Sequence, residues 1–142
     1  MMNTILIADD EESLRLLIRS TLESAELTLL EAGDGVTALE MARQELPDLI
    51  LLDWMMPGKT GLEVARELRA DPRTAAIAIL MLTAMGQEKD RKEALAAGVQ
   101  AFLVKPFSPL ELLERVQAVL RVAEFCRGER NETASVRDRK TA

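Results

Sequence analysis

Short apolar runs separated by amphipathic segments constrain the fold of this chain more than any other feature of its sequence. The runs show no polar alternation, which is typical of strands buried on both faces of a parallel sheet. Four of them cover residues 5–8, 49–52, 77–82 and 102–104. A weaker run over 28–32 ends in polar character and suits an edge strand.

In the segments between these runs, apolar residues recur every three or four positions, as they do on one face of a helix. The segment 87–97 has only a thin stripe, Ala94 and Leu95, so we expect its helix to be the least firmly anchored. Ser108, Pro109 and Glu111 are typical of the start of a last helix. The pattern predicts five βα units, an α/β fold with a doubly wound five-stranded parallel sheet. The stripes are Leu14, Leu17, Ile18, Thr21, Leu22 and Ala25; Val36, Leu39, Ala42 and Leu46; Leu62, Ala65 and Leu68; and Leu112, Leu113, Val116, Val119 and Leu120.

Composition narrows the chemistry and the compartment. A single cysteine, Cys126, excludes an internal disulfide, and the absence of histidine excludes His-ligated zinc and Ser-His-Asp catalysis. The net charge of −6 disfavours binding to nucleic acid or to an anionic membrane, and no apolar run approaches the ~20 residues that span a bilayer. We expect a soluble, cytoplasmic protein with one domain over 1–125 and a charged tail or linker stub, expected to be disordered, over 126–142.

Polar residues gather where the predicted strands end. Asp9 and Asp10 follow the first strand, Asp53 and Thr83 close the third and fourth, and Lys105 follows the fifth. If the strand order is 2-1-3-4-5, these strands are neighbours, and one pocket at their carboxyl ends holds all five residues. The long stem of Lys105 then reaches towards Asp53.

Three carboxylates in one pocket repel one another by about 3 kcal/mol per pair at roughly 5 Å and an effective dielectric near 20. Lys105 alone does not offset this repulsion. A hard divalent cation does, and Mg²⁺, with Mn²⁺ as an alternative, suits a few carboxylates and open positions for water and phosphate oxygens. Asp53 is then placed as a nucleophile on phosphorus, and Thr83 and Lys105 gather the phosphoryl oxygens.

These residues stand in four motifs that carry a family resemblance: ILIADDEE at 5–12, DLILLDWMMPGKTG at 48–61, MLTA at 81–84 and FLVKPF at 102–107. From residue 4 to about 122, the chain resembles the response-regulator receiver domains of two-component signalling. It is most similar to the receivers of winged-helix transcription factors. The resemblance implies a flavodoxin-like fold with strand order 2-1-3-4-5.

The resemblance also implies roles for single residues. Asp53 would be the phosphoacceptor, Asp10 would ligate Mg²⁺ directly and Asp9 mainly through water, and the Met55 backbone carbonyl would complete the protein ligands. Thr83 and Lys105 would contact the phosphoryl group. Phe102 would be the aromatic residue whose rotamer follows Thr83. The Lys105–Pro106 peptide bond is expected to be cis.

Partners follow from the same resemblance. A sensor histidine kinase, a histidine phosphotransfer protein or a small phosphodonor would supply the phosphoryl group, and the downstream partner or output domain stays open. The signal would pass through the face of the fourth helix, fifth strand and fifth helix, with phosphorylation-dependent homodimerisation as one outcome. Arg91, Glu111 and Arg115 stand at dimer-contact positions of that group. However, Ala96, Ala97, Gln100 and Ala101 leave the face short of acids, so we expect apolar contacts.

Other interpretations remain open at this point. Asp9 and Asp10 are also suited to cap the first helix, and Phe102 to be an ordinary core residue. A Mg²⁺-dependent aspartyl phosphohydrolase shares the strand-end Asp53, but Met55 stands where such an enzyme needs a second acid. An FMN module needs a hydroxyl- and glycine-rich phosphate loop where this chain has acids. A receiver-like interaction module that is never phosphorylated is the third alternative to a regulatory, non-enzymatic phosphoacceptor.

Overall fold

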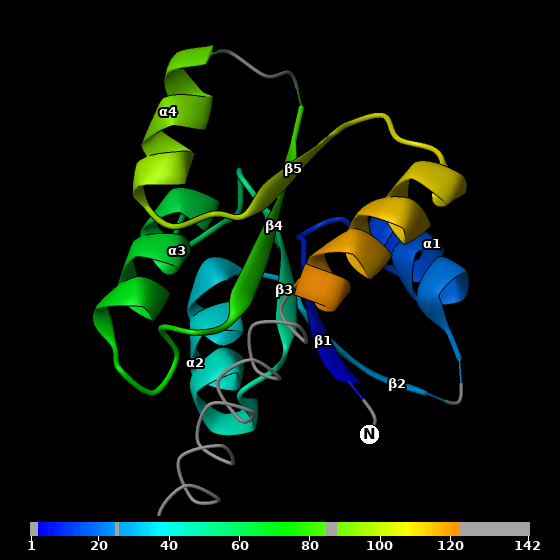
Figure 1. Ribbon diagram of the computed structural model, residues 1–142, viewed down its shortest axis with the longest axis horizontal. Helices are drawn as coiled ribbons and strands as arrows, with labels where there is room; N and C mark the ends of the chain where they lie inside the picture. The colour runs from blue at the N-terminus through cyan, green and yellow to red at the C-terminus, as the bar shows by residue number, and fades with distance from the viewer. Residues whose placement is uncertain (1–2, 25, 85–87, 123–142) are drawn as a thin grey trace, which may run out of the picture.

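A parallel sheet of five strands forms the centre of the molecule (Figure 1). The computed structural model describes residues 3–24, 26–84 and 88–122, with the side chains of 88–90 excepted. The order β2-β1-β3-β4-β5 confirms the predicted topology. The strands are β1 (Asn3–Ala8), β2 (Leu27–Ala32), β3 (Leu49–Asp53), β4 (Ala78–Thr83) and β5 (Ala101–Val104).

Helices cover both faces of this sheet, as Figure 1 shows. On one face lie α2 (Gly35–Glu45), α3 (Gly61–Ala70) and α4 (Glu88–Ala96). On the other lie α1 (Glu12–Leu22) and a helix over residues 109–122. Alternate residues of each central strand contribute to two separate cores, one under each layer. β3 and β4 are therefore buried along their whole length.

Local signals explain where several helices begin. The Asp34 side chain accepts a hydrogen bond from Thr37 N at 2.7 Å at the start of α2. Thr60 and Glu63 form a capping box at the start of α3. Ser108 Oγ accepts from Glu111 N at 3.1 Å, as expected for the start of the last helix. These caps supply partners for backbone N–H groups that a helix leaves unpaired.

Three large apolar residues of the stripes predicted for the first two helices are exposed. Leu17, Val36 and Leu46 are 40%, 43% and 51% exposed. Val36 lies in the first turn of α2, and Leu46 is the C-cap of that helix with φ 48°, a conformation that turns it out of the stripe. Helical spacing gives a face but not its width, which explains these errors.

The fourth helix is thinly anchored, as predicted. Ala94 is buried, whereas Leu95 is 57% exposed. Of the residues expected on the signalling face, Gln100 is exposed, whereas the expectation fails for Ala97. Ala97 is buried, and Gln100 Oε1 turns back to accept from Ile79 N at 2.7 Å and from Arg69.

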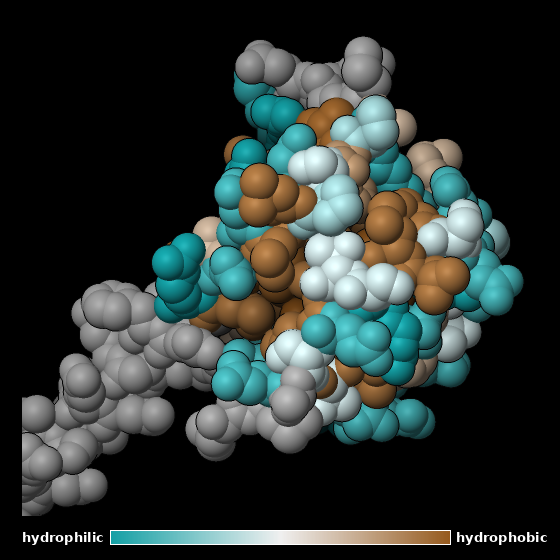
Figure 2. All heavy atoms as spheres, turned by 90° about the vertical axis from the view of Figure 1, so that its right-hand side faces the viewer, coloured by the Kyte–Doolittle hydropathy of each residue, from teal (hydrophilic) through white to brown (hydrophobic). Residues whose placement is uncertain are grey.

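The face of α1 and the helix over 109–122 carries several apolar patches between polar residues (Figure 2). In the part of the chain that the structure describes, no helix is long and apolar enough to cross a bilayer. Ala25, in the stripe predicted for the first helix, lies outside the described residues, as does the predicted boundary between a domain over 1–125 and a tail over 126–142.

Candidate functional site

The carboxyl ends of β1, β3 and β5 bring three predicted site residues to one side of the sheet edge. Asp9, Asp53 and Lys105 each follow, by two positions, a residue of the core under α1: Ile7, Leu51 and Leu103. Because side chains alternate along a strand, the three point to the same side. Thr83 instead follows Met81, which belongs to the core under α3. The pattern of alternation thus divides the predicted site residues between the two sides of the sheet edge.

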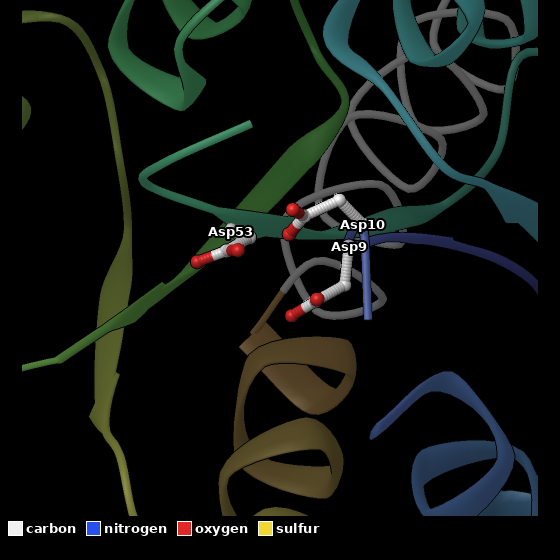
Figure 3. Close-up of side chains that lie close together, drawn as sticks. All are labelled: Asp9, Asp10 and Asp53. Carbon is white, nitrogen blue, oxygen red and sulfur yellow. The ribbon is translucent and has the colours of Figure 1, made fainter. Parts of the chain in front are cut away.

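Three carboxylates form the acidic part of the site. One oxygen from each of Asp9, Asp10 and Asp53 lies within 4.8 Å of the others. Figure 3 shows them converging from the segment after β1 and from the end of β3. Asp9 is fully buried and Asp53 is 6% exposed, whereas Asp10 is open to solvent. The cluster therefore offers hard oxygen ligands with one side accessible, a donor set that fits Mg²⁺.

Lys105 forms ion pairs with two of these carboxylates. Its Nζ lies 3.0 Å from Asp9 Oδ2 and 3.2 Å from Asp53 Oδ1. The Lys105–Pro106 peptide bond is cis, as predicted. One ammonium group therefore balances part of the charge of two buried acids, and neither of its two ion pairs involves Asp10.

The pKa values of Asp53 and Lys105 are each shifted by contributions of opposite sign. Burial raises the pKa of Asp53 to about 6, and the charge of Asp9 adds to this effect while Lys105 opposes it. For Lys105, burial alone lowers the pKa, but its hydrogen bond to Asp9 and the charges of both carboxylates raise it above the ordinary value. Near pH 6, therefore, the protonated and ionised forms of Asp53 are close in free energy.

Asp9 is held in place from its backbone and its side chain. Its Oδ1 accepts from Glu11 N at 2.8 Å, and its carbonyl oxygen accepts from Arg15 Nη1 at 2.6 Å. The N-cap of α1 is Glu11, which makes no side-chain cap bond, so capping does not account for Asp9. Arg15 was not predicted. Its position on a helix surface gives no sequence signal, because the contact depends on how α1 packs on β1.

Gly61 is a second positioning residue that the sequence analysis missed. Its N–H donates to Trp54 O at 2.8 Å, and a Cβ built on it would lie 2.3 Å from the carbonyl oxygen of Asp53. Only glycine allows α3 to begin this close to the end of β3. The GKTG stretch after Pro57 contains this glycine, but spacing alone does not reveal the close approach.

Thr83 and Phe102 belong to the side of the sheet that is covered by α3 and α4. Thr83 is 9% exposed at the end of β4, and none of the described hydrogen bonds joins its hydroxyl to Asp53. In the sheet register Met81 pairs with Phe102 and Thr83 with Val104, so Phe102 and Thr83 are on the same face. Phe102 is partly buried, and the guanidinium of Arg91 in α4 lies 5.7 Å from the centre of its ring.

Met55 lies in the connection between β3 and α3, and its side chain is exposed. A thioether in this position supplies no acid or base. The role predicted for Met55 involves only its backbone carbonyl. The side-chain chemistry of the site therefore comes from carboxylates, a hydroxyl and one lysine.

The fold and the cluster at the carboxyl ends of the strands together define a class of protein. The class is a doubly wound α/β domain whose buried carboxylates are bridged by a lysine at the switch point of the sheet. Residues 5–117 match the family described as the response regulator receiver domain, and the chain belongs to that family. It is thus a regulatory domain of phosphorylation-dependent two-component signalling and not a classical enzyme.

Curated relatives agree with this assignment. The phosphate regulon transcriptional regulatory protein PhoB of Pseudomonas aeruginosa is 48% identical over 118 residues, which are 83% of this chain and 52% of that protein. The transcriptional regulatory protein ResD of Bacillus subtilis is 44% identical over 119 residues, 84% of this chain and 48% of that protein. The chain therefore spans about half the length of these relatives.

Solved structures show the same fold over nearly their full length. The chemotaxis protein CheY4 of Vibrio cholerae superposes with a TM-score of 0.79 at 35% identity, covering 84% of this chain and 99% of that one. The response regulator domain of Thermotoga maritima CheB gives a TM-score of 0.75 at 25% identity, covering 85% and 98%. These structures share the receiver architecture without a second domain being needed to complete it.

Proposed function

We propose that this chain is a cytoplasmic switch that accepts a phosphoryl group on Asp53 in a reaction that requires Mg²⁺. The observation that carries the proposal is the bridge from Lys105 Nζ to both Asp9 and Asp53 beside the open carboxylate of Asp10. A histidine kinase, a histidine phosphotransfer protein or a small phosphodonor supplies the phosphoryl group. The downstream partner is not specified by this domain.

In the proposed reaction, an Asp53 carboxylate oxygen attacks phosphorus, and the bond from phosphorus to the donor breaks. The leaving group keeps the bonding electrons and takes a proton. Asp9, Asp10, Asp53 and the Met55 carbonyl would hold Mg²⁺, which when bound neutralises charge on the transferring group. Lys105 and the Thr83 hydroxyl stabilise the phosphoryl oxygens, and the burial of Asp53 keeps water away from its carboxyl.

We further infer that phosphorylation changes the face formed by α4, β5 and the helix over 109–122. When Thr83 turns towards the phosphoryl group it leaves space on its own face of the sheet, where Phe102 also lies. Phe102 then moves inward, away from Arg91. Because α4 is thinly anchored, a small local change shifts the population between two packings that a partner distinguishes.

The central test is phosphorylation in solution. Incubation of the chain with acetyl phosphate and Mg²⁺, followed by intact-mass measurement, should show one added phosphoryl group, and Asp53→Asn should show none. Asp48→Asn is the matched control, because Asp48 lies just before the opposite end of β3. It should be labelled like the parent chain.

The same measurement separates the alternatives. Consumption of acetyl phosphate without an adduct would indicate a phosphohydrolase. No reaction with any donor would indicate an unphosphorylated interaction module. Undiminished labelling of Asp53→Asn would place the phosphoacceptor at another residue.

A further inference from the structure

An apolar groove lies at the end of the sheet opposite to Asp53. It has a volume of about 680 Å³ and is bounded by the connection from α2 to β3, the connection from α3 to β4 and the far end of the helix over 109–122. Its lining includes Leu46, Ala76, Ile77, Ala118, Val119 and Val122. None of the residues assigned to the phosphoryl and metal site contributes to this groove.

Two residues of its rim are exposed in a way that needs an explanation. Leu46 is 51% exposed and Val122 is 62% exposed. Leu46 also has φ 48°, in the left-handed region that favours glycine or asparagine over a leucine. The left-handed backbone of Leu46 and the contact of its side chain with water are each unfavourable. The arrangement is favourable if another apolar segment covers Leu46.

The chain itself supplies such a segment immediately beyond the groove. Ala118, Val119 and Val122 line the groove from one stripe of their helix. The next positions at helical spacing on this stripe are 125 and 126, which are Phe125 and Cys126. Beyond Gly128, Val136 is the only large apolar residue in the sequence.

We propose that residues 123–126 pack against this groove, with Phe125 against the Leu46 side of it and Cys126 beside Val122. The segment that leaves the domain is then held by the two connections at the amino edge of the sheet. Arg69 lines the same groove and donates to Gly98 O at 2.6 Å, at the turn between α4 and β5. In this arrangement, residues 123–126 lie next to Arg69, which is hydrogen-bonded to the turn that follows α4.

Cys126 is the only cysteine, so its thiol reports directly on this packing. In the intact chain, the reaction of Cys126 with the thiol reagent DTNB should be slower, by about tenfold or more, than the reaction of an unprotected thiol. The reference is Thr141→Cys in a Cys126→Ser background, which places one thiol far along the chain. Leu46→Gly and, separately, Phe125→Ala should each accelerate the reaction of Cys126 towards the reference rate.

Leu46→Gly keeps the experiment interpretable, because glycine relieves the left-handed backbone while removing the side chain that the segment covers. Its urea midpoint and Trp54 emission should match or exceed those of the parent, so faster thiol reaction cannot come from global unfolding. Equal rates for Cys126 and the reference thiol in the parent chain would overturn the proposal. So would protection that survives both variants, or protection that disappears on dilution, which would indicate a second copy of the chain in the groove.

Discussion

At Asp53, burial and the charge of Asp9 favour the protonated carboxyl, while Lys105 favours the ionised one. Burial prevails, and the pKa rises from 3.8 to about 6. Ionisation of Asp53, the proposed nucleophile, therefore lowers the stability of the folded domain. A bound cation or a phosphoryl group offsets that cost, which couples the state of one side chain to the stability of the domain.

This shift predicts how stability depends on pH without metal. Between pH 3.8 and about 6 the folded state holds a proton that the unfolded state has released, so the free energy of unfolding falls as pH rises through this range. Asp53→Asn should remove the fall. In EDTA, urea unfolding should show this variant to be more stable than the parent by about 1–3 kcal/mol above pH ~7, and similar to it below pH ~4.

Asp34 provides a contrast of opposite sign. Its hydrogen bonds with the Thr37 backbone and side chain hold the pKa of Asp34 below its ordinary value. Asp34→Ala should therefore lose stability at neutral pH, and the loss should shrink as acid protonates Asp34 in the parent.

For Asp53, the contradicting outcome is a stability difference between the parent and Asp53→Asn that does not change with pH. Such a result would show that the pKa of Asp53 is not raised.

The sole tryptophan gives a direct measure of metal binding. Trp54 follows Asp53, is partly buried and donates its backbone N–H to Leu82 O at 2.9 Å. Titration with Mg²⁺ should change its emission, and Asp10→Ala should weaken the apparent affinity by about tenfold or more because it removes one of few ligands. Glu12→Ala removes a nearby exposed acid outside the cluster and should titrate normally. An unchanged titration of Asp10→Ala would place the metal elsewhere.

At the level of elements, the start of α3 and the end of β3 depend on each other. Gly61 donates its N–H to the residue after Asp53 and leaves no room for a side chain against the Asp53 carbonyl. The capping box of Thr60 and Glu63 fixes the helix start next to this contact. The position of Asp53, the proposed phosphoacceptor, is thus set partly by a helix that supplies none of the site's side chains.

Gly61→Ala should be destabilising although alanine is the better helix former. The added Cβ would meet backbone that can move only by shifting Asp53, so we expect a loss of about 1–3 kcal/mol in urea unfolding. A weaker Mg²⁺ titration should accompany this loss. Gly33→Ala is the control, because its Cβ would meet only the Arg15 side chain at an ordinary 3.4 Å. Parent-like stability and Mg²⁺ affinity in Gly61→Ala would refute the dependence of the site on α3.

All five strands were predictable because each is a short apolar run with no alternation, and the weakest run proved to be the edge strand β2. The helices were predictable as elements, but their exposed edges were not. Leu17 and Val36 fit a helical stripe by spacing, whereas their exposure depends on how the helix is rotated over the sheet. Gln100 is exposed, as its polar side chain suggests, but the sequence does not reveal that its Oε1 accepts from the backbone of β4.

At the scale of the whole molecule, the sheet separates the side chains of Asp9, Asp53 and Lys105 from α4, which is one part of the face proposed to carry the signal. Asp9, Asp53 and Lys105 continue the α1 side, whereas Thr83 and Phe102 belong to the side of α3 and α4. Thr83 is thus the residue best placed to transmit a change across the edge. Leu95 gives this face an exposed apolar side chain, whereas Ala97 is buried and does not contribute to it.

Self-association or partner binding through this face should resist added salt. Screening weakens exposed charge pairs far more than apolar burial. The affinity of the beryllofluoride-treated chain, measured across a salt series by analytical ultracentrifugation, should change little. Leu95→Ser should reduce it, while Leu16→Ser, an exposed leucine of α1, should not. A steep loss of affinity with salt would show that Arg91, Glu111 and Arg115 dominate the contact instead.

Most of the candidate site was predictable, because the carboxyl ends of neighbouring parallel strands meet at one edge. This rule brought Asp9, Asp10, Asp53 and Lys105 together without knowledge of the packing. It did not find Arg15 or Gly61, whose roles arise from a close approach between elements. Whether two elements approach so closely depends on differences of a few tenths of an ångström in their packing. The spacing of residues in the sequence does not encode such differences.

The bond between Lys105 and Asp9 joins residues that are 96 positions apart in the chain. A polypeptide growing from its amino end has made all three carboxylates long before the strand that delivers the lysine leaves the ribosome. Until then the acidic cluster lacks the ammonium group that pairs with Asp9 and Asp53 in the folded domain. The charge balance of this site is thus completed only after nearly the whole domain has been synthesised.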